Sequence, residues 1–130
     1  MPATESFTLS KEERMSSKLL INELFGGTES RSLVAFPLRL VYMKHDRDNE
    51  KQFAASILIS VHKRHFKHAV DRNKVKRQIR EAYRLHKSLL NYSEDQCVAM
   101  AFIWLDNKHH SSRRVEHCVT TLLKRMKERL

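Results

Sequence analysis

The sequence predicts one mixed α/β (α+β) domain, with its elements in the order α-β-β-α-β-α. Apolar residues alternate with other residues over 36–43 and 53–61, which is typical of strands. An unbroken apolar run over 98–105 is typical of a central strand that is covered on both faces. Apolar residues recur at helical spacing over 69–90 and again after residue 112. A chain of 130 residues with only two glycines and two prolines supports a single domain with short connections.

The first expected helix begins near Ser10, which forms a capping box with Glu13, or near Ser16-Ser17, and it ends at Gly26-Gly27. Residues 1–8 are expected to be a flexible tail of the single domain that spans 1–130. The chain does not start with a basic segment followed by an apolar run, so we expect no signal peptide.

The strand at 36–43 presents two different faces. One side carries Leu38, Leu40 and Tyr42, and the other carries Arg39, Val41 and Met43. The polar residues 44–51 are expected to form a hairpin loop that leads into the strand at 53–61. That second strand alternates Ile57, Ile59 and Val61 against Leu58 and Ser60. An additional strand near 32–35 is an alternative.

Residues 62–87 carry most of the positive charge. They hold ten Lys or Arg against Asp71 and Glu81, which is about +8 of the formal net charge of +10. Charge this dense on a short chain indicates a polyanionic partner, most often nucleic acid. At about 100° per residue, the expected helix over 69–90 has an apolar face made of Val75, Ile79, Ala82, His86 and Leu89. The far face carries Asn73, Lys76, Arg77, Arg80, Arg84 and Lys87, and Arg72 lies between the two faces.

The last two elements supply core residues. Trp104 lies in the apolar strand and is expected in the core, and Ser111-Ser112 is expected to cap the final helix. That helix has an apolar stripe formed by Val115, Val119, Leu122, Met126 and Leu130. Cys97 and Cys118 are expected to be reduced, mostly buried thiols of a cytosolic protein. No apolar stretch is long enough to cross a bilayer, so we expect a soluble, intracellular protein.

Three other groupings of residues are weighed as metal-binding, catalytic or phosphate-binding sites. His62, His65 and His68 recur every three residues, but the cations between them oppose metal binding, so we expect phosphate contacts there instead. The acidic residues of the expected loop, Asp46, Asp48 and Glu50, are expected to be solvated. No Ser/His/Asp or Cys/His set and no glycine-rich phosphate loop is present in the sequence. We therefore expect no catalytic residue, no metal site and no bound cofactor.

Ten residues, Arg72 to Glu81, carry a specific resemblance. They read Arg-Asn-Lys-Val-Lys-Arg-Gln-Ile-Arg-Glu, follow a strand ending in Val-His-Lys-Arg at 61–64, and precede the pair Tyr83-Arg84. This pattern resembles the protein subunit of bacterial ribonuclease P, over about residues 9 to 130.

The resemblance implies a fold and an activity. The implied fold is a small two-layer α/β sandwich, similar to a domain of a ribosomal protein, with a left-handed β-α-β crossover. The implied function is auxiliary: a large RNA, which requires magnesium, removes the 5′ leader of precursor tRNA, and the protein binds that RNA and the leader. The chain would then be an accessory subunit of an endoribonuclease in the bacterial cytoplasm, and it would broaden the range of substrates.

The resemblance also implies two sets of contact residues. Those expected to contact the catalytic RNA are Lys63, Arg64, Arg72, Asn73, Lys76, Arg77, Arg80 and Arg84. Those expected in the leader-binding cleft are Phe25, Ile21 and Tyr42. Glu81 is expected to orient Arg77 or Arg84. The chain departs from the family pattern at Ile21, where an aromatic is usual, and at Phe66-Lys67, where many members have a glycine.

A second function stays open from the residues alone. A basic helix of this kind also suits a stand-alone RNA- or DNA-binding module, either associated with the ribosome or placed in a DNA major groove. Asn73 and Gln78 lie about 140° apart on the helix, so backbone contacts to RNA explain its composition better.

Overall fold

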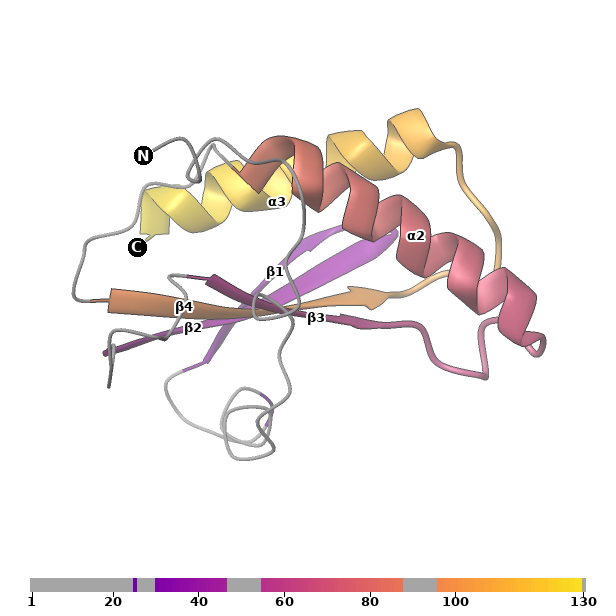
Figure 1. Cartoon of the computed structure of the whole chain (residues 1–130), viewed down its shortest axis with the longest axis horizontal. Coiled ribbons are helices and arrows are strands. Elements are labelled where there is room, and N and C mark those ends of the chain that lie inside the picture. The colour runs from indigo at the N-terminus through magenta and orange to yellow at the C-terminus, as the bar shows by residue number, and fades with distance from the viewer. Residues whose placement is uncertain (1–24, 26–29, 47–54, 88–95, 130) are drawn as a thin grey trace.

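The computed structural model describes residues 25, 30–46, 55–87 and 96–129 (Figure 1). The elements are β1 (Arg31–Ala35), β2 (Leu38–Asp46), β3 (Ala55–Ser60), α2 (Ala69–His86), β4 (Gln96–Trp104) and α3 (Ser112–Arg129). The expected mixed α/β class is confirmed, and so is the additional strand near 32–35, which is β1. The tail at 1–8 and the first helix lie outside the described residues, except for Phe25, which is helical.

The described strands form one sheet in the order β1-β2-β4-β3. β1 and β2 are antiparallel and meet at Phe36-Pro37, β2 and β4 are antiparallel, and β3 and β4 are parallel. The expected hairpin over 44–51 is therefore wrong, because β2 continues to Asp46 and β4 lies between β2 and β3. β4 takes this central place because its residues are apolar on both faces.

Both described helices cover one face of the sheet (Figure 1). α3 packs on β1 and β2, while α2 packs on β3 and lies beside α3. The main core between sheet and helices contains Leu38, Leu40, Tyr42, Phe102, Trp104, Val75, Ile79, Val119 and Leu122 among others. The expected burial of Trp104 is confirmed at 0% exposure.

The opposite face of the sheet carries a smaller apolar cluster. Val41 and Met43 from β2 lie there with Ala99 and Ala101 from β4, and Leu58 and Ile103 pack against them. The alternation predicted for the residues of β2 is thus confirmed. It also shows which face is which: Tyr42 points to α2 and α3, and Val41 points to the opposite face of the sheet.

The helix ends agree only partly with the sequence. α2 ends at His86, earlier than the expected residue 90. The expected cap of α3 is confirmed, because the Ser111 hydroxyl accepts a hydrogen bond from the Arg114 backbone nitrogen at 3.1 Å. Cys118 is a free, buried cysteine, as expected. Within the described ranges, neither helix is long and apolar enough to cross a membrane.

Candidate nucleic-acid interface

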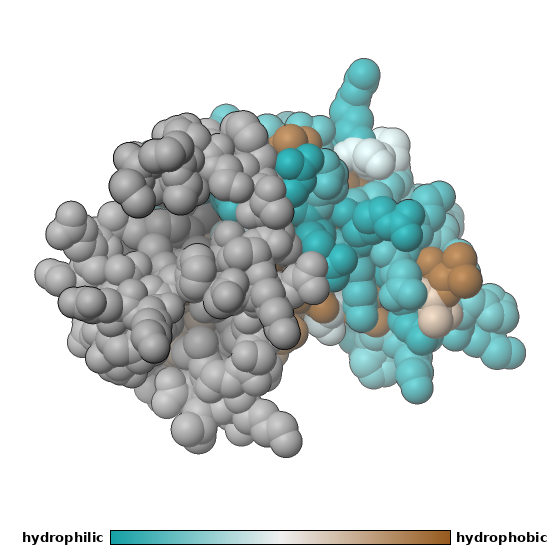
Figure 2. Space-filling view, in the orientation of Figure 1, coloured by the Kyte–Doolittle hydropathy of each residue, from teal (hydrophilic) through white to brown (hydrophobic). Residues whose placement is uncertain are grey.

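α2 is anchored by one face and presents cations on the other. Val75, Ile79, Ala82 and Tyr83 are buried beneath it, and Tyr83 packs edge-on against Phe102, with ring centroids 6.3 Å apart. Asn73 and Arg77 are exposed, while Lys76 and Arg80 are partly buried at the flank of the helix. In Figure 2 the visible, coloured surface over α2 and the segment before it is largely hydrophilic. The helix therefore offers a row of positive charge on a rigid base.

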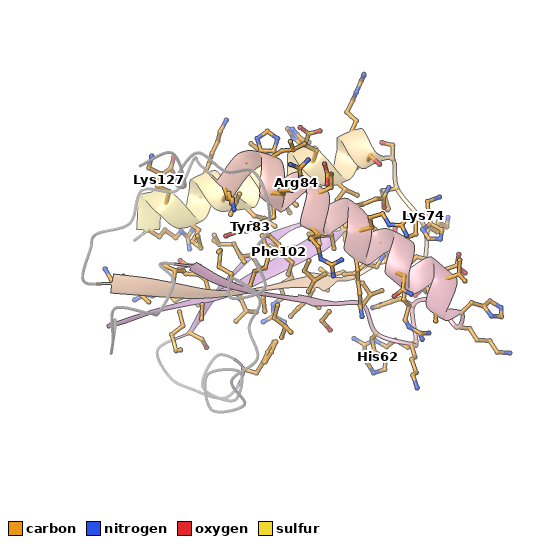
Figure 3. All side chains as sticks on the ribbon, viewed as in Figure 1. His62, Lys74, Tyr83, Arg84, Phe102 and Lys127 are labelled. Atoms are coloured by element: carbon orange, nitrogen blue, oxygen red, sulfur yellow. The ribbon has the colours of Figure 1, made fainter. Side chains whose placement is uncertain are left out.

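Arg84 is held by an acid of its own helix. Its Nε donates a hydrogen bond to Glu81 Oε2 at 3.1 Å, and its Nη2 forms an ion pair with Glu81 Oε1. This hydrogen bond lowers the pKa of the Glu81 carboxyl and raises the pKa of Arg84. Of the two arginines that Glu81 was expected to orient, the structure therefore selects Arg84, which is labelled on α2 in Figure 3.

The segment before α2 turns sharply and exposes two cations. The backbone nitrogen of Arg64 donates to His62 Nδ1 at 3.0 Å, and the backbone nitrogen of His65 donates to the His62 carbonyl at 3.0 Å. Lys63 and Arg64 are both exposed on this turn. They extend the positive surface of α2, in the place that the sequence predicted.

Arg72 has a different position from the one expected. It is partly buried, and its Nη1 donates to the carbonyl oxygens of Phe66 and Lys67, both at 2.9 Å. The guanidinium of Arg72 thus closes the turn before α2, and the expected contact with RNA stays a prediction. Both hydrogen bonds are possible because the Nη1 amino group carries two hydrogens, one for each carbonyl.

The connection between β4 and α3 supports the same turn. The His109 ring stacks on Phe66 with centroids 4.5 Å apart and an interplanar angle of 22°. His109 Nε2 also lies 3.1 Å from Asp71 Oδ1, and His65 Nδ1 lies 2.8 Å from Asn107 Oδ1. Sequence reasoning missed these partners. The signal available was Phe66 itself, an aromatic residue within the polar and basic segment 62–68.

The histidines at 62, 65 and 68 have different contacts from one another. His62 and His65 make the contacts described above, and His68 precedes α2 without a side-chain cap. Among the described residues, no group of three His, Cys, Asp or Glu side chains could hold a metal ion. Asp48 and Glu50 of the expected loop lie outside the described residues.

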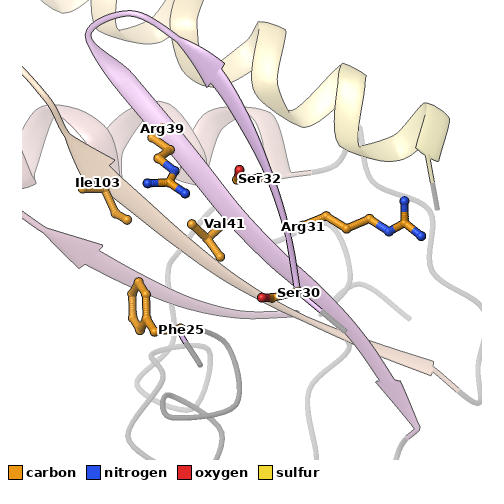
Figure 4. A pocket seen from close by; sticks show the side chains of 7 residues that line it. All are labelled: Phe25, Ser30, Arg31, Ser32, Arg39, Val41 and Ile103. Carbon is orange, nitrogen blue, oxygen red and sulfur yellow. The ribbon is translucent and has the colours of Figure 1, made fainter. Parts of the chain in front are cut away.

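A second candidate site is a pocket on the face of the sheet opposite α2 and α3 (Figure 4). It has a volume of about 260 Å³. Its lining includes Phe25, Arg31, Ser32, Arg39, Val41 and Ile103. Phe25 is 49% exposed, and both arginines are exposed. The Phe25 ring and the Arg39 guanidinium form the kind of combination that single-stranded nucleic acid binds, through base stacking and phosphate contacts, while the Arg31 side chain points away from this pair (Figure 4).

Two expected cleft residues are not found in this pocket. Ile21 lies outside the described residues. Tyr42 is only 3% exposed and belongs to the main core under the helices, so its assignment to the cleft is corrected. Because side chains alternate along β2, the neighbours Val41 and Arg39 face the pocket instead.

Comparisons with known proteins agree with this geometry. The family model described as Ribonuclease P matches residues 9–127. A curated Porphyromonas gingivalis protein, "Ribonuclease P protein component", is 40% identical over 129 residues, which cover 97% of this chain and 91% of that protein. A relative of the same name from Chlorobium phaeobacteroides is 37% identical over 84 residues, covering 64% of this chain and 56% of that protein.

Solved structures show the same fold. A mutant RNase P protein of Staphylococcus aureus superposes with a TM-score of 0.69 at 22% identity, covering 90% of each chain. The RNase P protein of Thermotoga maritima superposes with a TM-score of 0.66 at 21% identity, covering 86% of this chain and 96% of that one.

Proposed function

Because the chain belongs to the family of ribonuclease P protein components, part of an endoribonuclease holoenzyme, we propose a division of its surface between two RNAs. The cationic face of α2 and the turn at 62–68 bind the catalytic RNA. The pocket on the face of the sheet opposite α2 and α3 binds the 5′ leader of precursor tRNA. These two surfaces lie on opposite sides of the sheet, so both RNAs can be held at once.

The observation that carries this proposal is that α2 has one buried apolar face and one cationic face. Its buried face fixes the helix on the sheet, so the charges opposite are held in place before any partner arrives. Asn73, Lys76, Arg77 and Arg80 then contact phosphates directly, together with Lys63 and Arg64. Arg72 acts through the turn that it closes, and Arg84 acts from the position that Glu81 gives it. Long basic side chains at successive turns suit a phosphate backbone.

The leader site rests on the pocket. Phe25 supplies a ring for one base, Arg39 contacts the leader phosphates, and Val41 and Ile103 form an apolar floor. The proposal also includes Ile21 beside the cleft. Its aliphatic side chain would contact the leader at a position where the family usually has an aromatic residue. Base stacking and phosphate contacts do not distinguish one base from another, so the leader is held with little sequence preference.

The chemistry belongs to the RNA partner in this proposal. Magnesium ions bound by that RNA would activate the water. The described residues of this chain offer no group of metal ligands, so the chain would contribute binding and orientation. Holding the leader and the catalytic RNA together raises the effective concentration of the substrate at the RNA active site. The proposed setting is the bacterial cytoplasm.

The test combines the protein with the catalytic RNA transcribed from the same genome. Protein free of RNA is expected to leave precursor tRNA uncut, and the mixture is expected to cleave it at low magnesium. A variant with Lys76→Gln, Arg77→Gln and Arg80→Gln should bind the RNA more weakly, with a salt slope reduced by about 2 to 3 units for three lost contacts. Cleavage by the protein alone, or an unchanged salt slope in the variant, would overturn the proposal.

A further inference from the structure

α3 carries as much charge as α2. Each helix has six Lys or Arg and two acids within its bounds, which gives each a net charge of +4. On α3, one of the two acids, Glu116, lies 2.7 Å from His86 Nε2 of α2. An ordinary solvated helix balances its cations with acids one turn away. The charge of α3 therefore calls for an explanation of its own.

The helix dipole explains only part of that charge. Lys127 and Arg129 lie in the last turn, where cations are favoured. The first turn, however, holds Arg113 and Arg114 and no acid, and cations there are opposed by the positive end of the dipole. Arg114 has an internal partner, the Phe36 carbonyl at 3.4 Å. Within the described part of the chain, Arg113 has no hydrogen bond or ion pair.

The cations of α3 fall on two sides of the helix. Arg114 and Arg125 face β1, since they donate to the carbonyls of Phe36 and Val34 at 3.4 and 3.3 Å. Glu116 marks the side that faces α2. At about 100° per residue, Arg113, Lys124 and Lys127 lie within about 80° of Glu116 around the helix axis. All three are exposed, and we call them the α3 outer face.

The α3 outer face is continuous with the proposed interface. α2 and α3 pack side by side in one layer over the sheet, and Figure 3 labels Arg84 and Lys127 in this layer, above the sheet. Arg113 and Lys124 are separated by about 16 Å along the helix at 1.5 Å per residue. A large polyanion seated on α2 therefore meets a second row of cations on its neighbour.

From these observations, and resting on the proposed function, we propose that the α3 outer face is a second docking surface for the sugar-phosphate backbone of the catalytic RNA. The precursor is a poorer occupant, because the pocket proposed for its leader lies on the other face of the sheet. The contact is independent of sequence, since it consists of point charges and offers no fork aimed at a base. It widens the footprint of the RNA from one helix to two.

The test compares neighbouring positions on one helix. The outer variant carries Arg113→Gln and Lys124→Gln, and the matched control carries Arg114→Gln and Arg125→Gln. Both lose two charges from nearly the same places and keep a residue that favours helix. Binding to the catalytic RNA alone, without precursor, is measured between 50 and 200 mM salt. The outer variant should lower the salt slope by about 1.4 to 1.8 units, while the control keeps the slope of the parent protein.

Two further readouts separate this surface from the proposed function. Arg113→Gln alone should leave the melting temperature unchanged or slightly higher, because it removes a cation from the positive end of a helix dipole, while RNA affinity falls. Lys124→Arg should bind like the parent protein. Equal slopes in the outer variant and the control would overturn the inference, and the α2 variant would still test the proposed function. A loss seen only for precursor binding by the holoenzyme would also overturn it.

Discussion

Arg72→Lys is the most informative single change at this interface, because lysine keeps the positive charge but lacks the planar guanidinium group. In the parent protein one guanidinium nitrogen donates to the Phe66 and Lys67 carbonyls, each at 2.9 Å. The lysine ammonium ends a stem that is one bond shorter and more flexible than that of Nη1, so it is expected to keep only one of these two hydrogen bonds. The turn that presents Lys63 and Arg64 should therefore spend less time in its binding conformation.

The magnitude follows from the lost hydrogen bond. A hydrogen bond to a charged group contributes about 1.5 to 3 kcal/mol, and the partial exposure of Arg72 favours the lower end. A loss of about 1.4 kcal/mol corresponds to about tenfold in affinity if RNA binds only the closed turn. The salt slope should stay unchanged, because the charge is retained.

The assay is equilibrium binding to the catalytic RNA at several salt concentrations. Arg77→Lys serves as the control, because Arg77 is exposed and makes no hydrogen bond or ion pair within the described residues. It should bind nearly as well as the parent protein. If Arg72→Lys also binds like the parent protein while Arg72→Ala lowers the slope by about 0.9, then Arg72 contacts phosphate directly and the argument from the turn is refuted.

Three other outcomes are expected. Phe25→Ala should cost about 1 to 3 kcal/mol of leader binding, seen for precursors with long leaders and not for one-nucleotide leaders; equal losses on both, with a lower melting temperature, would instead make Phe25 a packing residue. Ile79→Ala, at a position with 0% exposure, should lower the free energy of unfolding by about 2 to 5 kcal/mol, measured by urea denaturation; a smaller loss would mean that α2 is not fixed by its buried face. The hydrogen bond from His110 holds the pKa of the Asp106 carboxyl below its ordinary value of 3.8. Its stabilising effect is therefore present above that pH and lost as the pH falls through the lower folded-state pKa, so Asp106→Asn should flatten the fall of melting temperature in that acid range.

Much of the interface was readable from the sequence because helix and strand periods are local. The spacing of Val75, Ile79 and Ala82 fixes which side of α2 is buried, and the cations opposite follow from the same 100° step. Alternation along β2 separated Leu40 and Tyr42 from Val41 in the same way. The charge of 62–87 pointed to a polyanion before any fold was known.

Only the tertiary structure decided how those faces are used. Which side of β2 lies under the helices depends on partners far along the chain, so Tyr42 entered the core and Val41 the pocket. The strand order placed β4 between β2 and β3, because pairing is set by burial of both faces and not by nearness in sequence. The stack of His109 on Phe66, and the contact of His109 with Asp71, arise from a connection about 40 residues away. No local period encodes such contacts, because they exist only when the sheet brings the two segments together.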